Sequence, residues 1–528
     1  MKRNPLLAGT LLLTAAGFLS RILGFFYRIF LSRTIGAEGL GIYQMIFPIH
    51  GIAFAICCGP IQTSISRMAS ADVKKGRSAF RTGLAISLCL SFSIMGAIYA
   101  AAEPLARYVL LEPRCTPLLP VMALSIPFSA IHACICGYYY GLKKTAVPAF
   151  SQLIEQLIRI GAVFLIAHVA AVNKRPISVS LAVWGMLIGE AGSAVFSFLF
   201  YSISTGGKKK RSEESGDGEE NEALQEERMG KKAIHRPSFF SIAGPLMAMA
   251  LPLMGNRLIL NCLQSLEAIF VPNKLMAFGL GNSESLSLYG VLTGMALPFI
   301  LFPSAITNSL AVILLPTVSE AQALGNQGRI QRTIAMALRY SLYMGILCIG
   351  VFTLFGDALG QTVYRNEEAG SFITVLAWLC PFMYLSTTMG SILNGLGKTS
   401  SVFLHTAISM LITLSSVVFW IPSYGIYAYL GGLLLSELVL AFLHIHTLSG
   451  AIPVRLNLGS MLMKPALCLA VAIGILRRLE PYLEGLQGAL PTEFLFVMVQ
   501  AGILSALYGG GLLVLHRGRS ERSGAARE

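Results

Sequence analysis

The chain has 528 residues, of which 55% are hydrophobic and only 12% charged, and its mean hydropathy is +0.68. Soluble domains carry about 25% charged residues, so this composition excludes a soluble protein and indicates an all-α polytopic membrane protein. The formal net charge of +14 is explained by membrane topology rather than by binding of a nucleic acid.

Apolar runs of about 20 residues predict about fourteen transmembrane helices. They cover residues 6–31, 41–66, 79–102, 117–141, 148–171, 178–204, 239–271, 286–318, 334–356, 371–396, 400–420, 425–448, 459–477 and 491–516. Lys and Arg gather in the connections that face the cytoplasm when the N-terminus lies inside, so the positive-inside rule places both termini in the cytoplasm.

The first predicted span carries a polar stripe. At 100° per residue one face holds Thr10, Thr14, Gly17, Arg21, Gly24 and Arg28. An arginine within the bilayer costs roughly 2.5–3.5 kcal/mol, so this face is expected to turn towards protein or a wet cavity. Arg21 and Arg28 together suit an anion such as a pyrophosphate. The alternatives are that Arg28 reaches the interface and that Arg21 pairs with a carboxylate of another helix.

Two sequence matches relate the halves of the chain. Phe47-Pro48 recurs as Phe302-Pro303, and the Gly-Leu-x-Lys-Thr-like turn at 141–145 recurs at 395–399, at offsets of 255 and 254 residues. We therefore predict two pseudo-symmetric six-helix lobes around a cavity. The predicted parts are an N-terminal lobe, a charged cytoplasmic linker, a C-terminal lobe, two extra transmembrane helices and a basic tail, at 1–204, 205–237, 238–449, 450–516 and 517–528. The linker has too few apolar residues for a core, and a contact with anionic lipid is the alternative.

The seventh span, which opens the second half, is also unusually polar. Its polar residues are Asn256, Arg257, Asn261, Gln264 and Glu267. A cation with amides suits a sugar-phosphate headgroup, whereas an Arg257–Glu267 type of network would only join helices. Asn308 on the eighth span is a further candidate.

Other ionisable residues have simpler expectations. Glu155 and Arg159 are spaced for a local ion pair. Glu190 and Glu437 are candidates for coupling to Na⁺ or H⁺, or else partners of neighbouring helices. His444 and His446 point to different helix faces, which argues against a metal pair, and His405 is expected to be an interior histidine.

Catalytic motifs are missing from the sequence. The turn at 395–399 resembles a phosphate loop, but the Walker pattern needs glycine where Ile392 stands. We expect a transporter without a bound cofactor, driven by an ion gradient, the membrane potential or the gradient of its substrate.

Several stretches resemble the stage V sporulation protein B family of oligosaccharide flippases, within the multidrug/oligosaccharidyl-lipid/polysaccharide exporter superfamily. They are residues 13–21, 27–33, 35–44, 306–321 and 393–399. The resemblance implies two lobes that move lipid-linked sugars or drugs by alternating access. Arg21 falls on a cavity arginine of the lipid II flippase branch. The next family arginine falls at Tyr27, one position from Arg28, and an arginine pair expected near Ile52 and Ala53 is missing.

These observations predict a flippase for an undecaprenyl-pyrophosphate-linked precursor, in spore cortex or cell-wall synthesis at the bacterial cytoplasmic membrane. Arg21 and Arg257, from opposite lobes and with Arg28, would hold the pyrophosphate, while the amides contact sugar. Membrane lipids and cell-wall synthesis enzymes are the expected partners. The alternatives are a cation-coupled multidrug exporter and a membrane enzyme, of which the latter needs a large acidic outer loop.

Overall fold

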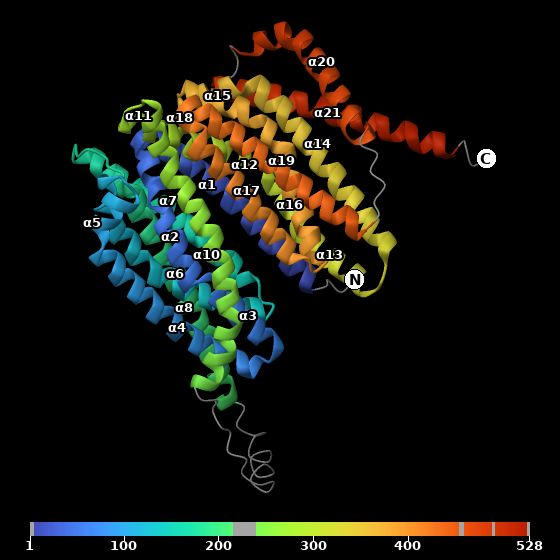
Figure 1. Cartoon of the computed structure of the whole chain (residues 1–528). Coiled ribbons are helices and arrows are strands. Elements are labelled where there is room, and N and C mark those ends of the chain that lie inside the picture. Colours follow the sequence, from blue (N-terminus) through green and yellow to red (C-terminus); the bar gives the residue numbers. More distant parts are fainter. Residues whose placement is uncertain (1–4, 215–238, 453–458, 488–491, 525–528) are drawn as a thin grey trace. The chain divides into compact units, whose positions relative to one another are not determined.

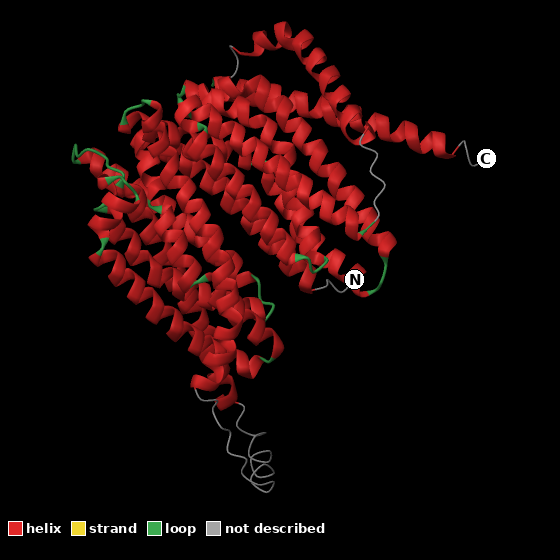
Figure 2. Cartoon of the chain, viewed as in Figure 1, coloured by secondary structure: helices red, strands yellow, loops and turns green. Residues whose placement is uncertain are grey.

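The structure is a computed structural model that describes residues 5–214, 239–452, 459–487 and 492–524. Within these ranges the chain is helical and contains no strand (Figure 2). In the described part, 13 helices are long and apolar enough to cross a membrane by length and composition. The predicted class, an all-α polytopic membrane protein with about fourteen spans, is confirmed.

The spans differ from the prediction in three places. The first two predicted spans lie in one stretch, Leu12–Ala71, and the eighth is divided into Asn282–Leu301 and Ser304–Ala323. The thirteenth does not qualify as a span, because α20 (Lys464–Gln487) has charged residues near both ends of its apolar part. The first difference arises because the chain stays helical through the predicted connection at 32–40, and the second because the helix is interrupted at Phe302-Pro303.

Two helices are shared between the two compact units into which backbone contacts divide the chain. The first unit comprises residues 1–24 and 45–265, and the second comprises 25–44 and 266–528. The shared helices are α1 (Pro5–Met45) and α10 (Phe239–Phe278). Residues 25–44, predicted in the N-terminal lobe, thus belong to the second unit, and residues 239–265, predicted in the C-terminal lobe, belong to the first. The boundaries of the lobes stay a prediction.

The first unit packs around α6. Besides its parts of α1 and α10, it contains α2 (Phe47–Cys57), α3 (Gly59–Ala71), α4 (Val73–Ala100), α5 (Ala102–Pro104), η1 (Leu105–Val109), η2 (Pro113–Cys115), α6 (Leu118–Gly141), α7 (Ala146–Val172) and α8 (Ser180–Glu214) (Figure 1). Helix α6 contacts α3, α4 and α8, and an apolar core joins Ile65, Phe80 and Ile135. The predicted linker begins inside α8, and its residues 215–237 lie outside the described residues.

The second unit packs around α14, α16 and α19. Its further helices are α11 (Asn282–Gly290), η3 (Val291–Ala296), α12 (Leu297–Leu301), α13 (Ser304–Ala323), α14 (Gln327–Leu359), η4 (Gly360–Tyr364), α15 (Glu367–Leu376), η5 (Ala377–Leu379), α16 (Cys380–Gly395), α17 (Thr399–Phe419), α18 (Ile421–Tyr424), α19 (Ile426–Ala451), η6 (Gly459–Met463), α20 and α21 (Glu493–Gly524). Met389, Ile392 and Leu448 belong to its apolar core.

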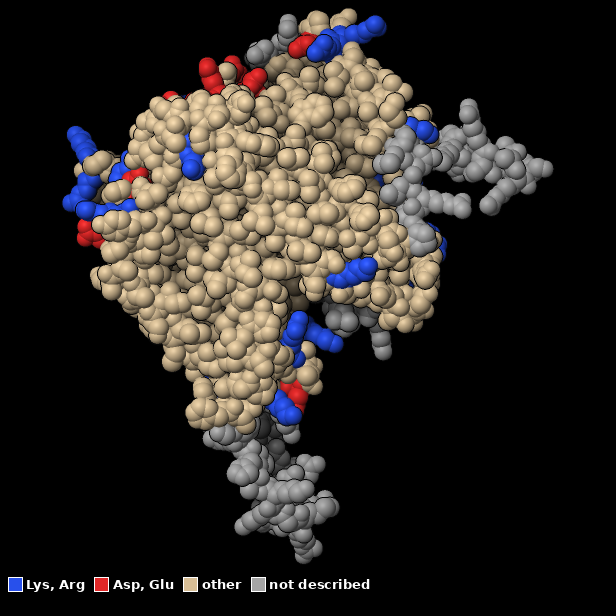
Figure 3. Space-filling view, in the orientation of Figure 1, with Lys and Arg blue, Asp and Glu red and all other residues tan. Residues whose placement is uncertain are grey.

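On the face shown in Figure 3, charged side chains are sparse and the surface is mostly uncharged, which suits lipid.

The two repeated motifs have the same structural role in both halves. Phe47-Pro48 opens α2 after a break in the helix, and Phe302-Pro303 directly precedes α13. Helices α6 and α16 end at the first glycine of the repeated turn. Two residues later the backbone is left-handed in both turns, with φ of 58° at Lys143 and 76° at Gly397.

Helix α1 continues past the predicted end of the first span at residue 31. It contains one non-helical residue, Gly36, with φ of 72°. A side chain there would be strained in this backbone region, which is why a glycine lets the helix bend and continue to Met45.

Candidate functional site

The polar face of α10 lies against α2 and α3 in the first unit. The hydroxyl of Ser265, one turn beyond Asn261, donates to the carbonyl of Pro48 at 3.3 Å. A Cβ on Gly51 would lie 2.9 Å from Asn261 Oδ1, and one on Gly59 would lie 3.0 Å from Arg257 Cζ and closer still to its Nη1. The glycines of α2 and α3 thus leave room for the side chains of Arg257 and Asn261.

Arg257 is an exposed side chain within a membrane-length helix. Among the described residues no carboxylate forms an ion pair with it. Glu267, the partner considered from the sequence, instead accepts a hydrogen bond from the Tyr429 hydroxyl at 2.5 Å in the second unit. Asn256 and Gln264 are exposed on the same helix.

The polar stripe of α1 borders open space in the first unit. A Cβ on Gly17 or Gly24 would have no atom within 4 Å, and the Arg21 side chain is exposed between them. Arg28 lies in the second unit, where its Nη1 donates to the carbonyl of Thr293 at 3.2 Å. The stripe of the sequence is therefore divided between the two units.

The remaining candidate also lies in the second unit. Asn308 donates through Nδ2 to the carbonyl of Ser304 at 2.8 Å and to its hydroxyl at 3.3 Å. Arg21 and Arg257, expected on opposite lobes, both belong to the first unit. The structure thus groups Arg21, Asn256, Arg257, Asn261 and Gln264 in one unit, and Arg28, Glu267 and Asn308 in the other.

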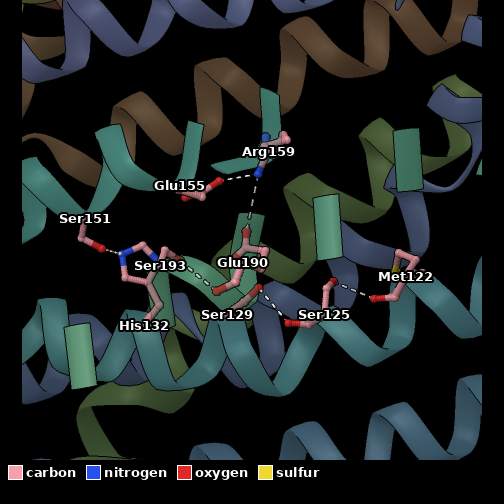
Figure 4. A network of polar contacts seen from close by, with 9 residues as sticks. All are labelled: Met122, Ser125, Ser129, His132, Ser151, Glu155, Arg159, Glu190 and Ser193. Carbon is pink, nitrogen blue, oxygen red and sulfur yellow. Dashed lines mark hydrogen bonds and ion pairs between the residues drawn. The ribbon is translucent and has the colours of Figure 1, made fainter. Parts of the chain in front are cut away.

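A partly buried polar cluster, formed by His132, Glu155, Arg159 and Glu190, lies in the first unit (Figure 4). Arg159 pairs with Glu155, as the sequence predicted, and its Nη2 also lies 4.0 Å from Glu190 Oε1. Both carboxylates are 14% exposed. The cluster joins α6, α7 and α8.

His132 is the member that the sequence did not reveal. Its Nε2 lies 2.6 Å from the Ser151 hydroxyl and its Nδ1 lies 3.3 Å from the Ser193 hydroxyl. Ligand atoms of His132, Glu155 and Glu190 lie within 4.8 Å of one another. Two carboxylates sharing one guanidinium leave one excess negative charge when both are ionised, and such a group can bind a cation.

A cavity of about 750 Å³ lies in the second unit where α1, α12, η4 and α21 approach one another. Its lining is mainly aromatic and aliphatic, with Arg33 and Arg365 among its polar residues. Arg33 is fixed by hydrogen bonds from Nε and Nη2 to the Val363 carbonyl, at 2.9 and 2.6 Å. The cavity can accept an apolar chain that carries a polar end.

The chain matches the family model described as polysaccharide biosynthesis protein over residues 6–322. It is 26% identical over 468 residues to stage V sporulation protein B of Bacillus subtilis (strain 168), covering 87% of this chain and 86% of that protein. It is 23% identical over 437 residues to the lipid II flippase MurJ of the same organism, covering 78% and 76%.

Solved structures share the fold. A lipid II flippase MurJ in an inward closed conformation gives a TM-score of 0.71 at 13% identity, with 96% of this chain and 99% of that chain covered. An inward-facing multidrug resistance MATE family transporter of the MOP superfamily gives 0.60 at 11% identity, covering 81% and 93%. The family resemblance drawn from the sequence is confirmed.

Proposed function

Because the chain belongs to the polysaccharide biosynthesis protein family, we propose that it is a flippase that moves a lipid-linked sugar precursor across the bacterial cytoplasmic membrane by alternating access. The precursor is an undecaprenyl-pyrophosphate-linked sugar used in spore cortex or cell-wall synthesis, where cell-wall synthesis enzymes are its partners. The names of two relatives, a sporulation protein and a lipid II flippase, support this assignment.

The observation that carries the proposal is Arg257. It is an exposed arginine within a membrane-length helix, and no carboxylate of the described residues pairs with it. Because an intramembrane cation is costly, such residues usually mark the path of a charged substrate. Arg257 with Arg21 would bind the pyrophosphate, and Asn256, Asn261 and Gln264 would donate to sugar hydroxyls.

The second unit supplies a place for the lipid. The cavity beside α21 is largely apolar, and Arg33 and Arg365 contribute to its lining. The apolar lining lets a polyprenyl segment pass from the bilayer into the cavity without exposing CH₂ groups to water, which would cost roughly 0.8 kcal/mol each. The two arginines outnumber the one acidic residue of the lining, Glu493, and so favour the phosphate end. We assign this cavity to part of the polyprenyl chain.

The test is flipping of a fluorescent polyprenyl-pyrophosphate-linked sugar in vesicles that contain the purified full chain. We expect Arg257→Gln to slow flipping at least tenfold and Arg257→Lys to lose less, because losing one charged hydrogen-bond partner costs about 1.5–3 kcal/mol. Arg107→Gln is the control, because Arg107 is exposed and pairs with Glu103 away from the site. Flipping at the full rate in a normally inserted Arg257→Gln protein would contradict the proposal.

We also propose that H⁺ or Na⁺ drives the cycle through the Glu155–Arg159–Glu190 group. Its excess carboxylate requires a second positive charge inside the membrane. Glu190→Gln removes that excess, so we expect flipping to lose its dependence on the pH or Na⁺ gradient. Glu103→Gln is the matched control, because Glu103 is 61% exposed. An unchanged gradient dependence in Glu190→Gln would exclude this group.

A cation-coupled multidrug exporter is the second candidate, favoured by the fold shared with the MATE transporters. Such an exporter should raise the resistance of cells to cationic drugs when it is overproduced, and Arg257→Gln should then leave drug export intact. The precursor assay and the resistance assay therefore separate the two functions.

A further inference from the structure

Two histidines far apart in the sequence meet inside the second unit. His405 on α17 and His444 on α19 are 7% and 2% exposed. Their ring centroids lie 5.1 Å apart with the rings nearly perpendicular. The pair lies seven residues or fewer from the ends of α17 and α19 that the sequence places on the cytoplasmic side.

Each ring has one hydrogen-bond partner and one nitrogen without any among the described residues. His444 Nδ1 lies 2.8 Å from the carbonyl oxygen of Leu440. A carbonyl only accepts, so Nδ1 carries the proton and Nε2 is the bare nitrogen. His405 Nε2 lies 3.3 Å from the Thr447 hydroxyl. His405 Nδ1 and His444 Nε2 are buried without a partner.

Among the described residues, His444 Nε2 has no hydrogen-bond partner. A Cβ on Gly390 of α16 would lie 3.3 Å from Nε2, so the backbone of α16 covers it. Ala441 and Leu448, one turn to either side, belong to the apolar core that α16 shares with α19.

Few titratable groups face the pair. The titratable residues of α16 are Tyr384 and Cys380, which lie six and ten residues before Gly390 along the helix. His405 is the group from α17. On α19 the next is Glu437, two turns before His444 on the same face, with Oε2 buried and without a partner in the described chain.

A protonated imidazole has two N–H donors and needs an acceptor for each. In the described packing each ring has only one oxygen partner, so this conformation fits two neutral rings. A proton on His444 Nε2 would place an unpaired N–H against the α16 backbone. A second proton would add repulsion between two cations at this separation.

We propose that His405 and His444 form a one-proton binding site whose affinity depends on the packing of α16 against α19. The closed packing excludes the proton, and a conformation in which α16 moves away admits one. A hydronium ion transfers its proton to a bare ring nitrogen and leaves as water, with no other bond changed. By linkage, acid then favours the open packing. Assigning the proton to a transport cycle rests on the proposed function, whereas the site itself does not.

The test uses the full chain with ¹⁵N-labelled histidine in lipid nanodiscs, without any lipid-linked sugar. His405→Gln and His444→Gln assign the two rings among the eight histidines of the chain. At about pH 8 both rings should be neutral, with His444 protonated at Nδ1; towards about pH 5 the pair should gain one proton. Amide exchange in residues 385–393 and 441–448, corrected for its intrinsic pH dependence, should rise roughly tenfold over the same range.

The control is His446→Gln, because His446 is exposed on the same helix and stacks on Phe442. It should keep the acid response, while His444→Gln, or His405→Gln if the first variant does not insert, should abolish it. Rings that stay neutral to about pH 5, or an equal acid response in His444→Gln, would overturn the proposal. If the response holds while precursor flipping fails, only the proposed function is wrong.

Discussion

Single residues set how close Arg257 comes to the break between α2 and α3. A Cβ at Gly59 would overlap the end of the Arg257 side chain. We expect Gly59→Ala to displace the guanidinium and slow precursor flipping several-fold. Because that end is flexible, the free energy of unfolding should change by less than about 1 kcal/mol.

The control for Gly59→Ala is Gly96→Ala, since a Cβ on Gly96 of α4 meets open space. It should flip precursor at the wild-type rate. Flipping rates in vesicles and thermal unfolding of the purified variants check both expectations. A fully active Gly59→Ala protein would show that transport does not depend on the position of the Arg257 guanidinium.

Helical periodicity correctly predicted contacts between residues on one helix, because these depend only on their spacing in the sequence. Asn261 and Arg257 lie on one face because they are four residues apart, and Glu155 pairs with Arg159 for the same reason. The contact of His405 with His444 depends on how α17 packs against α19, which no local pattern contains. The sequence therefore indicated each histidine singly and missed the pair.

At the scale of elements, the repeated turn after α6 and α16 uses different residues for one backbone shape. Lys143 adopts φ of 58° where Gly397 has 76°. A side chain in the left-handed region costs roughly 1 kcal/mol relative to glycine. We expect Lys143→Gly to raise the free energy of unfolding by about that amount, and Gly397→Ala to lower it similarly.

Lys144→Gly is the matched control for this turn, because Lys144 has no positive φ in the structure. It should not stabilise the protein. Thermal unfolding in one detergent compares the three variants, and a destabilised Lys143→Gly protein would show that the lysine side chain matters more than its backbone strain.

Element boundaries were predictable where apolar runs meet turn residues. The turn between α16 and α17 follows from its glycines. The Phe-Pro pairs were recognised only as a repeat, and the predicted spans ran through the breaks at which both pairs stand. The extension of α1 to Met45 was missed because Gly36 and the polar residues near it are typical of a loop. Tertiary packing of α1 in the second unit outweighs that local preference.

At the scale of the whole molecule, the predicted topology can be tested by labelling. In a Cys89→Ser/Cys262→Ser background, Arg175→Cys should react with an impermeant maleimide in intact cells. Gln327→Cys should react only after the membrane is opened, because its segment is predicted to be cytoplasmic. Both positions are exposed in the structure. Labelling of Gln327→Cys in intact cells would show that the protein has the opposite orientation to the predicted one.

The native Cys115 should not disturb this experiment. It lies in η2, outside the membrane-length helices, and burial raises the pKa of its thiol to about 12. The thiol is therefore neutral at physiological pH and gains its reactive thiolate form only as the pH rises towards that value. We expect Cys115 to remain unlabelled until the protein is unfolded.

The sharing of α1 and α10 between the compact units limits how the protein can be divided. The boundaries at Gly24–Phe25 and Ser265–Leu266 fall within continuous helices rather than in connecting loops. A protease that cuts between α8 and α10 would sever the chain yet leave both units joined through α1 and α10. A fragment designed to fold as the first unit must keep residues 239–265. A fragment that stops at residue 204 would lack the part of α10 that contributes Ile242 and Leu246 to the apolar core of that unit.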